Sequence, residues 1–246
     1  MKAVFALFLC CLVIASRASF LEDAVEMVES SSNDGTCYSV YSGYYFPGYE
    51  PPFSFIPKIF HGFNSKSALS KMIRFDGNTA QYLFTPTDPK GHLCGTSWNK
   101  LWGTTRCGYL DLVHQDSDRF VWRRAQSCLN YKGDYVTGVK PNCTEANRIE
   151  LAAYTYDNGV VPYQHIGTLL KQFKATVEIG VWYKYTLEIT DTQTNFILAD
   201  ANGNEIERQF TLHRNCSSQN KGNLLSFYFG GQCAAPQTVT ACYKDI

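Results

Sequence analysis

The chain has no excess of charge of either sign, because its 246 residues contain 22 Lys and Arg against 22 Asp and Glu. A general nucleic-acid-binding protein needs a basic surplus that releases counterions from phosphates, so we expect no nucleic-acid partner. Charged residues make up only 18% of the chain, whereas aromatic residues make up 15%. This composition favours a folded domain with a large core over intrinsic disorder.

Motifs that mark common catalytic and metal sites are missing. The five histidines form no H-x-H or H-E-x-x-H pattern, and no C-x-x-C pair has the spacing of a structural zinc site. No G-x-S-x-G sequence supports the nucleophile of an α/β-hydrolase. We therefore expect a protein that is not an enzyme and that has no resident metal or cofactor.

No apolar run is long enough to span a bilayer. Residues 3–15 are apolar, and they match the hydrophobic region of a signal peptide that begins with Lys2 and ends at the small residue Ala18. We expect residues 1–18 to be cleaved and the mature protein to be secreted and extracellular, with no transmembrane anchor. The alternative is that this segment remains as an anchor.

Cysteine is abundant in the remaining chain, which we divide into a flexible leader (residues 19–36) and a single β-rich domain (residues 37–246). The sequence has 10 cysteines, and removing Cys10 and Cys11 leaves eight. An even number in a secreted chain indicates a disulfide framework, although spacing alone cannot choose the pairing. The eight are Cys37, Cys94, Cys107, Cys128, Cys143, Cys216, Cys233 and Cys242.

Two N-glycosylation acceptor sequences are consistent with secretion. They begin at Asn142 and Asn215, and each has a cysteine in its middle position, where disulfide closure can compete with glycosylation. We expect at least one of these asparagines to carry a glycan, which would place it on the surface.

Alternating apolar and polar residues predict an all-β, antiparallel protein with only minor α structure. The strongest alternation covers residues 177–190, which we expect to form one strand. Turn sequences rich in Asn, Asp and Gly predict hairpins at residues 76–78 and 201–204. Only residues 145–153 and 164–172 offer helix patterns, and both patterns are weak.

Acidic residues in the expected turns were considered as calcium ligands. The segment from Asp200 to Glu205 places Gly fourth, whereas an EF-hand loop needs Gly sixth and Glu twelfth, so this match fails. Asp116 and Asp118 flank another short turn-like sequence. Turn formation is the simpler interpretation of both segments.

Several short blocks, taken in order, resemble the ependymin-related protein family. The blocks are Cys37, the strand and acidic turn at 73–78, a hairpin ending at Cys128, Cys216, the aromatic strand at 224–230, Pro236 and Cys242. The resemblance implies a strongly curved antiparallel sheet with an apolar pocket, stapled by disulfides. It implies the pairs Cys37–Cys216 and Cys128–Cys242 as well.

The same resemblance implies a function. It implies binding of a lipid or other hydrophobic small molecule, association with extracellular matrix components, possible calcium binding and a possible homodimer. The candidate residues of the pocket wall are Val181, Tyr183, Tyr185, Leu187, Phe227 and Phe229. The same side chains could instead form a closed core, and the sequence leaves this alternative open.

A carbohydrate-binding or carbohydrate-active β-sandwich is the second hypothesis. A catalytic version would need two carboxylates close together, but Glu178 and Glu188 would lie ten residues apart on the predicted strand, roughly 33 Å when extended. Sheet topology separates the hypotheses, because one bent sheet around a cavity favours the first and two stacked sheets favour the second. A structural component of an extracellular coat is a third possibility.

Overall fold

The computed structural model describes most of the domain predicted above. It divides the chain into residues 1–36 and 37–246, and the account below concerns the second unit. The described residues are 35–45, 63–64, 68–84, 94–107, 116–132, 135–214, 222–225, 227–230 and 233–246. Within these ranges, no helix has the length and apolar character needed to cross a membrane.

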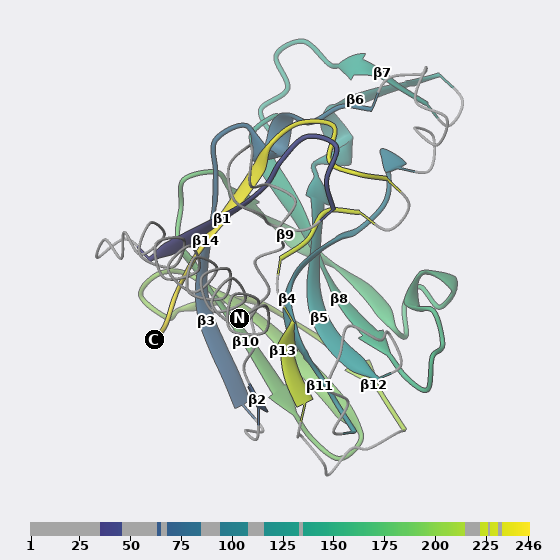
Figure 1. Ribbon diagram of the computed structural model, residues 1–246, viewed down its shortest axis with the longest axis vertical. Coiled ribbons are helices and arrows are strands. Elements are labelled where there is room, and N and C mark those ends of the chain that lie inside the picture. The colour runs from purple at the N-terminus through teal and green to yellow at the C-terminus, as the bar shows by residue number, and fades with distance from the viewer. Residues whose placement is uncertain are drawn as a thin grey trace, which may run out of the picture. The chain divides into compact units, whose positions relative to one another are not determined.

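The strands form two six-stranded sheets in which every pairing is antiparallel (Figure 1). In the first sheet the order is β1 (Thr36–Val40), β14 (Val239–Lys244), β3 (Ala68–Asp76), β10 (Tyr183–Ile189), β11 (Gln193–Ala199) and β12 (Glu205–Leu212). In the second sheet the order is β2 (Phe63–Asn64), β13 (Gly222–Leu225), β4 (Asn99–Thr105), β5 (Ser117–Arg124), β8 (Arg148–Tyr156) and β9 (Leu170–Glu178).

Short elements complete the described part of the domain. A separate hairpin consists of β6 (Leu129–Lys132) and β7 (Tyr135–Val139). Three 3₁₀ turns are η1 (Thr79–Gln81), η2 (Gln126–Cys128) and η3 (Pro162–Gln164). The predicted all-β, antiparallel, disulfide-stapled fold is confirmed. Its strands are divided between two sheets, the arrangement associated above with a β-sandwich.

Aromatic side chains from both sheets form the core between them. The ring of Phe120 in β5 lies 5.1 Å from Tyr185 in β10 and 5.2 Å from Phe196 in β11, measured between centroids. Trp122 in β5 lies 5.1 Å from Phe75 in β3. All five side chains are buried in one hydrophobic cluster, so apolar burial is the main force that holds the sheets together.

The long strand predicted over residues 177–190 is wrong, because a turn divides it. Strand β9 ends at Glu178 and β10 begins at Tyr183, with Gly180 between them at φ +81°. This left-handed conformation is costly for residues with a Cβ and ordinary for glycine. The apolar alternation on both sides of Gly180 concealed the turn, since the two strands belong to different sheets.

The two predicted hairpins had opposite outcomes. The turn at 201–204 does connect the antiparallel strands β11 and β12, as predicted. The hairpin at 76–78 is wrong, because η1 follows β3 and no return strand pairs with it. Strand β3 already has β10 and β14 on its two sides, so neither edge is available to residues 80–84.

Both predicted helices are wrong. Residues 145–153 enter β8, and residues 164–172 run from η3 into β9. Strand β8 lies between β5 and β9 and is buried on both faces, so it lacks the polar face that marks an ordinary strand. Its short apolar run therefore could not be told from a helix by periodicity.

The predicted turn at Asp116 and Asp118 is a buried ion cluster. Nε of Arg106 lies 2.9 Å from Oδ2 of Asp118, and Nη2 of Arg106 donates a hydrogen bond to the carbonyl of Tyr156 at 2.6 Å. Oδ1 of Asp116 accepts a hydrogen bond from the amide of Asn158 at 2.8 Å. Because Arg106 and both aspartates are buried, this pairing offsets the cost of removing their charges from water.

Disulfides occur as predicted, but with a different pairing. The pairs in the described chain are Cys37–Cys242, Cys94–Cys233 and Cys128–Cys143, and Cys107 is disulfide-bonded as well. The family-derived pairs Cys37–Cys216 and Cys128–Cys242 are therefore wrong. Cys37 meets Cys242 because β1 pairs alongside β14, whereas Cys128 and Cys143 lie at the base of the β6–β7 hairpin.

Candidate functional site

The candidate residues of the pocket wall do not share one environment. Val181 is 40% exposed in the turn before β10, and Tyr183 is partly buried at the margin of the core. Four of the six are at most 1% exposed and belong to the packed cluster between the sheets: Tyr185, Leu187, Phe227 and Phe229. Side chains without accessible surface fill the core, so these four do not line an open pocket.

The first predicted glycosylation site lies on the surface. Asn142 is exposed in a turn and has φ +58°, a left-handed conformation that asparagine tolerates. Its neighbour Cys143 is bonded to Cys128. The second acceptor, Asn215, and the adjacent Cys216 lie outside the described residues.

The carboxylate of Asp200 closes the β11–β12 turn. Its oxygens accept hydrogen bonds from the backbone amide of Asn202 at 2.9 Å and from the amide and side chain of Asn204, both at 2.8 Å. These bonds, above all those of Asn204, hold the pKa of Asp200 below its usual value. This arrangement matches the simpler interpretation of the segment as a turn.

The two glutamates considered for acid–base chemistry lie in different sheets. Glu178 ends β9 and pairs with Arg148 at 2.5 Å, whereas Glu188 in β10 pairs with Arg208 at 3.1 Å.

The outer face of the first sheet carries an aromatic residue among cations. Trp182 directly precedes β10 and is partly exposed, with Cζ of Arg74 at 4.9 Å and Nζ of Lys244 at 4.5 Å from its ring centroid. Lys184 and Lys244 lie on either side of Met72 in the strand register. We call Arg74, Trp182, Lys184 and Lys244 the Trp182 patch.

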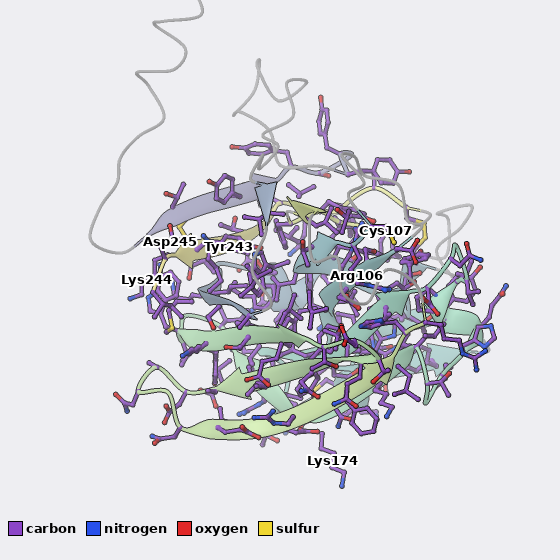
Figure 2. All side chains as sticks on the ribbon, turned by 90° about the horizontal axis from the view of Figure 1, so that it is seen from below. Arg106, Cys107, Lys174, Tyr243, Lys244 and Asp245 are labelled. Atoms are coloured by element: carbon purple, nitrogen blue, oxygen red, sulfur yellow. A yellow bond between two sulfur atoms is a disulfide. The ribbon has the colours of Figure 1, made fainter. Side chains whose placement is uncertain are left out.

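The Trp182 patch has a positive surplus. Arg74 is balanced by Asp76 at 2.8 Å, but neither Lys184 nor Lys244 forms an ion pair with any other residue in the described ranges. Figure 2 shows Lys244 near the end of β14 and Lys174 of β9 well apart from it. Alternation over residues 177–190 puts Trp182 and Lys184 on the same face of a strand, but no local pattern connects Arg74 and Lys244 with them.

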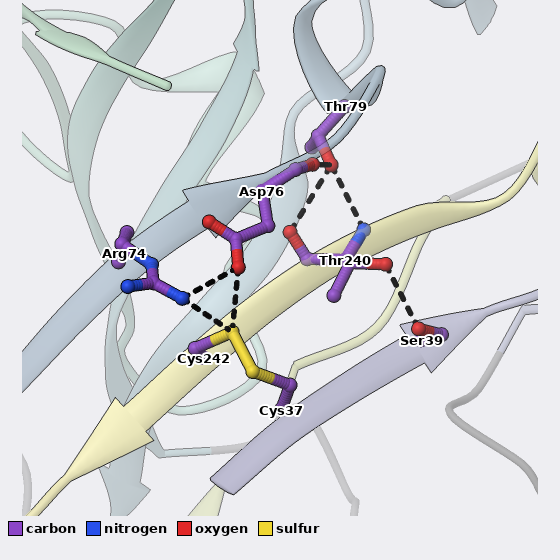
Figure 3. Close-up of a disulfide and its surroundings, with 7 residues drawn as sticks. All are labelled: Cys37, Ser39, Arg74, Asp76, Thr79, Thr240 and Cys242. Carbon is purple, nitrogen blue, oxygen red and sulfur yellow. Dashed lines mark hydrogen bonds and ion pairs between the residues drawn. A yellow bond between two sulfur atoms is a disulfide. The ribbon is translucent and has the colours of Figure 1, made fainter. Parts of the chain in front are cut away.

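A disulfide between Cys37 in β1 and Cys242 in β14 lies beside Arg74 of the patch, which is in β3 (Figure 3). Sγ of Cys242 lies 3.1 Å from Oδ2 of Asp76 and 3.8 Å from Nη2 of Arg74. Cys37, Asp76 and Cys242 have the proximity of metal ligands, but both sulfurs are used in the disulfide and neither is a thiolate. The arrangement therefore fixes β1 and orients Arg74 rather than forming a metal site.

Comparison with known proteins gives no family assignment. No protein-family model matches the chain, and no curated protein matches it.

Solved structures resemble the chain only weakly. A carbohydrate-binding module from Bacillus subtilis aligns with 75% of this chain and 74% of its own, at 7% identity and a TM-score of 0.32. The CBM2 module of an evolved Dit protein from Lactobacillus casei BL23 phage J-1 aligns over 85% and 76%, at 8% identity and 0.40. An alginate lyase from Klebsiella pneumoniae aligns over 72% and 56%, at 11% identity and 0.37. Similarity at this level does not establish a shared fold or function.

Proposed function

We propose that this chain is a secreted, non-enzymatic protein that binds acidic carbohydrate chains of the extracellular matrix through the Trp182 patch. The observation that carries the proposal is the partly exposed indole of Trp182 beside the ammonium groups of Lys184 and Lys244, which form no ion pair within the described ranges. The disulfides support an oxidising compartment outside the cytosol.

The chemistry of the patch suits a sugar acid. The indole ring offers a flat apolar surface for the C–H face of a pyranose. Lysine ammonium groups on neighbouring strands can pair with a carboxylate or sulfate on the same sugar or the next one. A neutral sugar would gain only the stacking contact, so the patch should discriminate by charge.

Pre-organisation favours binding at this place. Arg74 forms an ion pair with Asp76 and lies beside the Cys37–Cys242 disulfide, so the guanidinium group next to the Trp182 ring is held in place. A site whose groups are already ordered loses less conformational entropy when the ligand binds. The ependymin relationship, a lipid ligand, calcium binding and a homodimer stay predictions that the patch neither requires nor excludes.

Calorimetric titration with hyaluronan and heparin oligosaccharides, against neutral dextran, tests the proposal. We expect binding of an acidic oligosaccharide that weakens as salt is raised, and no binding of dextran. Trp182→Ala and the double variant Lys184→Ala/Lys244→Ala should each weaken binding at least tenfold.

Lys174→Ala is the matched control, because Lys174 is an exposed lysine of β9 in the other sheet. Its affinity should equal that of the unmodified protein. Equal weakening in the control, or no preference for acidic over neutral sugar, would overturn the proposal.

A further inference from the structure

Two cations are buried side by side on the outer face of the second sheet. Lys100 in β4 is 6% exposed and Arg119 in β5 is 1% exposed. Neither forms an ion pair with a carboxylate in the described part of the chain, and the side chain of Arg119 interacts there with the neutral hydroxyl of Tyr228 rather than with an anion. Nζ of Lys100 donates to the backbone carbonyl of Trp98 at 3.1 Å, its one hydrogen bond among the described residues.

Three tyrosines surround this pair of cations. Nζ of Lys100 lies 4.9 Å from the ring centroid of Tyr154 and 5.8 Å from that of Tyr228, and Cζ of Arg119 lies 5.9 Å from that of Tyr228. The ring of Tyr156 packs against Tyr154 at 5.5 Å. Tyr228 is held beside β4 because its backbone exchanges two hydrogen bonds with Lys100, both at 3.0 Å.

The backbone around Arg119 leaves no room for a larger neighbour. Gly103 in β4 lies opposite Arg119, which in turn lies opposite Tyr154 in β8. A Cβ on Gly103 would lie 2.0 Å from the carbonyl oxygen of Asp118 and 3.0 Å from Cγ of Arg119. Glycine at this position therefore permits the close approach of β4 to the backbone of Asp118 and Arg119.

Nearby carboxylates are engaged with other partners. Glu150 pairs with Arg123 at 2.8 Å, and Asp118 pairs with Arg106 at 2.9 Å. Burial, and secondly the neighbouring Arg119 cation, lower the pKa of Lys100 to about 7. Burial raises the pKa of Tyr154, Tyr156 and Tyr228, so their hydroxyls keep their protons.

Two buried cations without an anion cost more free energy than a buried ion pair does. Each cation loses its hydration, and the two repel each other. We infer that Lys100 and Arg119 form a binding site for an oxyanion, a carboxylate or sulfate group, with the tyrosines forming its walls. Arginine and lysine supply the charge-assisted hydrogen bonds that such groups accept.

The oxyanion has two conceivable sources, a free small anion or the acidic head of an amphiphile. The second is worth testing because apolar side chains lie on the same face of the sheet. They are Trp98, Val121, Ala152 and Leu170, which pack together with Tyr154 and Tyr156. The site is independent of the Trp182 patch, which lies on the other sheet.

Titration calorimetry of the full chain with sodium sulfate, acetate and laurate, against sodium chloride at equal ionic strength, tests the inference. Run at about pH 7.5 in two buffers of different ionisation enthalpy, it also counts protons. A bound anion stabilises protonated Lys100, so we expect saturable binding with uptake of a fraction of a proton. Sulfate and acetate binding as tightly as laurate would indicate a free anion, whereas laurate binding at least tenfold tighter than acetate would indicate a head group.

Two variants locate the site. Arg119→Gln should weaken binding at least tenfold, and Lys100→Met should abolish the proton uptake as well as weaken binding. Arg123→Gln is the matched control, because Arg123 lies on the same face of β5 but is paired with Glu150. Circular dichroism of each variant shows whether it folds, and the proton count on the unmodified protein stands without any variant.

Three results would overturn the inference. They are the absence of saturable binding by every oxyanion, binding without proton uptake, and affinities in folded Arg119→Gln and Lys100→Met equal to that of the unmodified protein.

Discussion

Glu207 in β12 accepts a hydrogen bond from the backbone amide of Ala175 in β9, at 2.7 Å. Its other carboxylate oxygen accepts from the amide of Lys174 at 3.0 Å. Strand β12 is the last strand of the first sheet and β9 is the last strand of the second. One side chain thus joins the two sheets along this side and satisfies edge amides that lack a neighbouring strand.

Truncating this carboxylate should destabilise the protein. Glu207→Ala leaves two amides without their acceptor, and we expect the free energy of unfolding to fall by about 1–3 kcal/mol. Urea denaturation measures the change. Glu205→Ala is the control, because Glu205 forms an exposed pair with Arg208 and should cost about 0.5 kcal/mol or less. Equal losses in the two variants would contradict the role given to Glu207.

Two buried tyrosines on the inner face of the first sheet should respond differently to loss of the hydroxyl. The hydroxyl of Tyr243 donates to the carbonyl of Leu101 in the opposite sheet at 2.8 Å, whereas that of Tyr185 has no hydrogen-bond partner in the described part of the chain. Tyr243→Phe should destabilise by about 1 kcal/mol, and Tyr185→Phe should be neutral or stabilising. Thermal unfolding of both variants checks this, and a larger loss at Tyr185 would contradict it.

Stability should rise with pH because of Lys100. Burial lowers the pKa of Lys100 to about 7, below its value in the unfolded chain, so the unfolded state binds more protons between these pKa values. This group alone should add about 2 kcal/mol to the free energy of unfolding between about pH 7 and pH 9 in chloride buffer. Lys100→Met should lose this increment. The exposed-lysine variant Lys174→Met should retain it, and an unchanged slope in Lys100→Met would refute the assignment.

Asn142 should carry a glycan when the chain is secreted from eukaryotic cells. Its side chain is exposed in a turn, so the glycosylating enzyme can reach this asparagine even after folding begins. Occupancy should increase when Cys128→Ser and Cys143→Ser remove the competing disulfide. Gel mobility before and after deglycosylation measures occupancy. A smaller shift in Asn142→Gln than in the unmodified protein is expected, and equal shifts in the two proteins would contradict the prediction.

The sequence could predict the fold class but not the grouping of the strands. Alternation between Tyr183 and Ile189 put alternate side chains of β10 on one face, and the Asn-Gly sequence at 202–203 located the β11–β12 hairpin. The strands next to β3 come from distant parts of the chain, and no local pattern encodes that pairing. Apolar residues on both faces of β8 likewise removed the signal that distinguishes strand from helix.

The candidate sites depend on juxtapositions that periodicity cannot show. Trp182 meets Arg74 and Lys244 only because β10 and β14 pair with the two sides of β3. The sequence around Lys100 and Arg119 does not distinguish them from exposed charged residues, because their burial depends on tertiary packing. The sequence could not predict the cysteine pairing either, because a pair such as Cys37–Cys242 depends on which strands become neighbours.

The bond between Cys37 and Cys242 fastens the first strand of this domain to its last, 205 positions along the chain. A protease that cuts any intervening loop would therefore release nothing, since both fragments would stay in one covalent piece until a reductant was added.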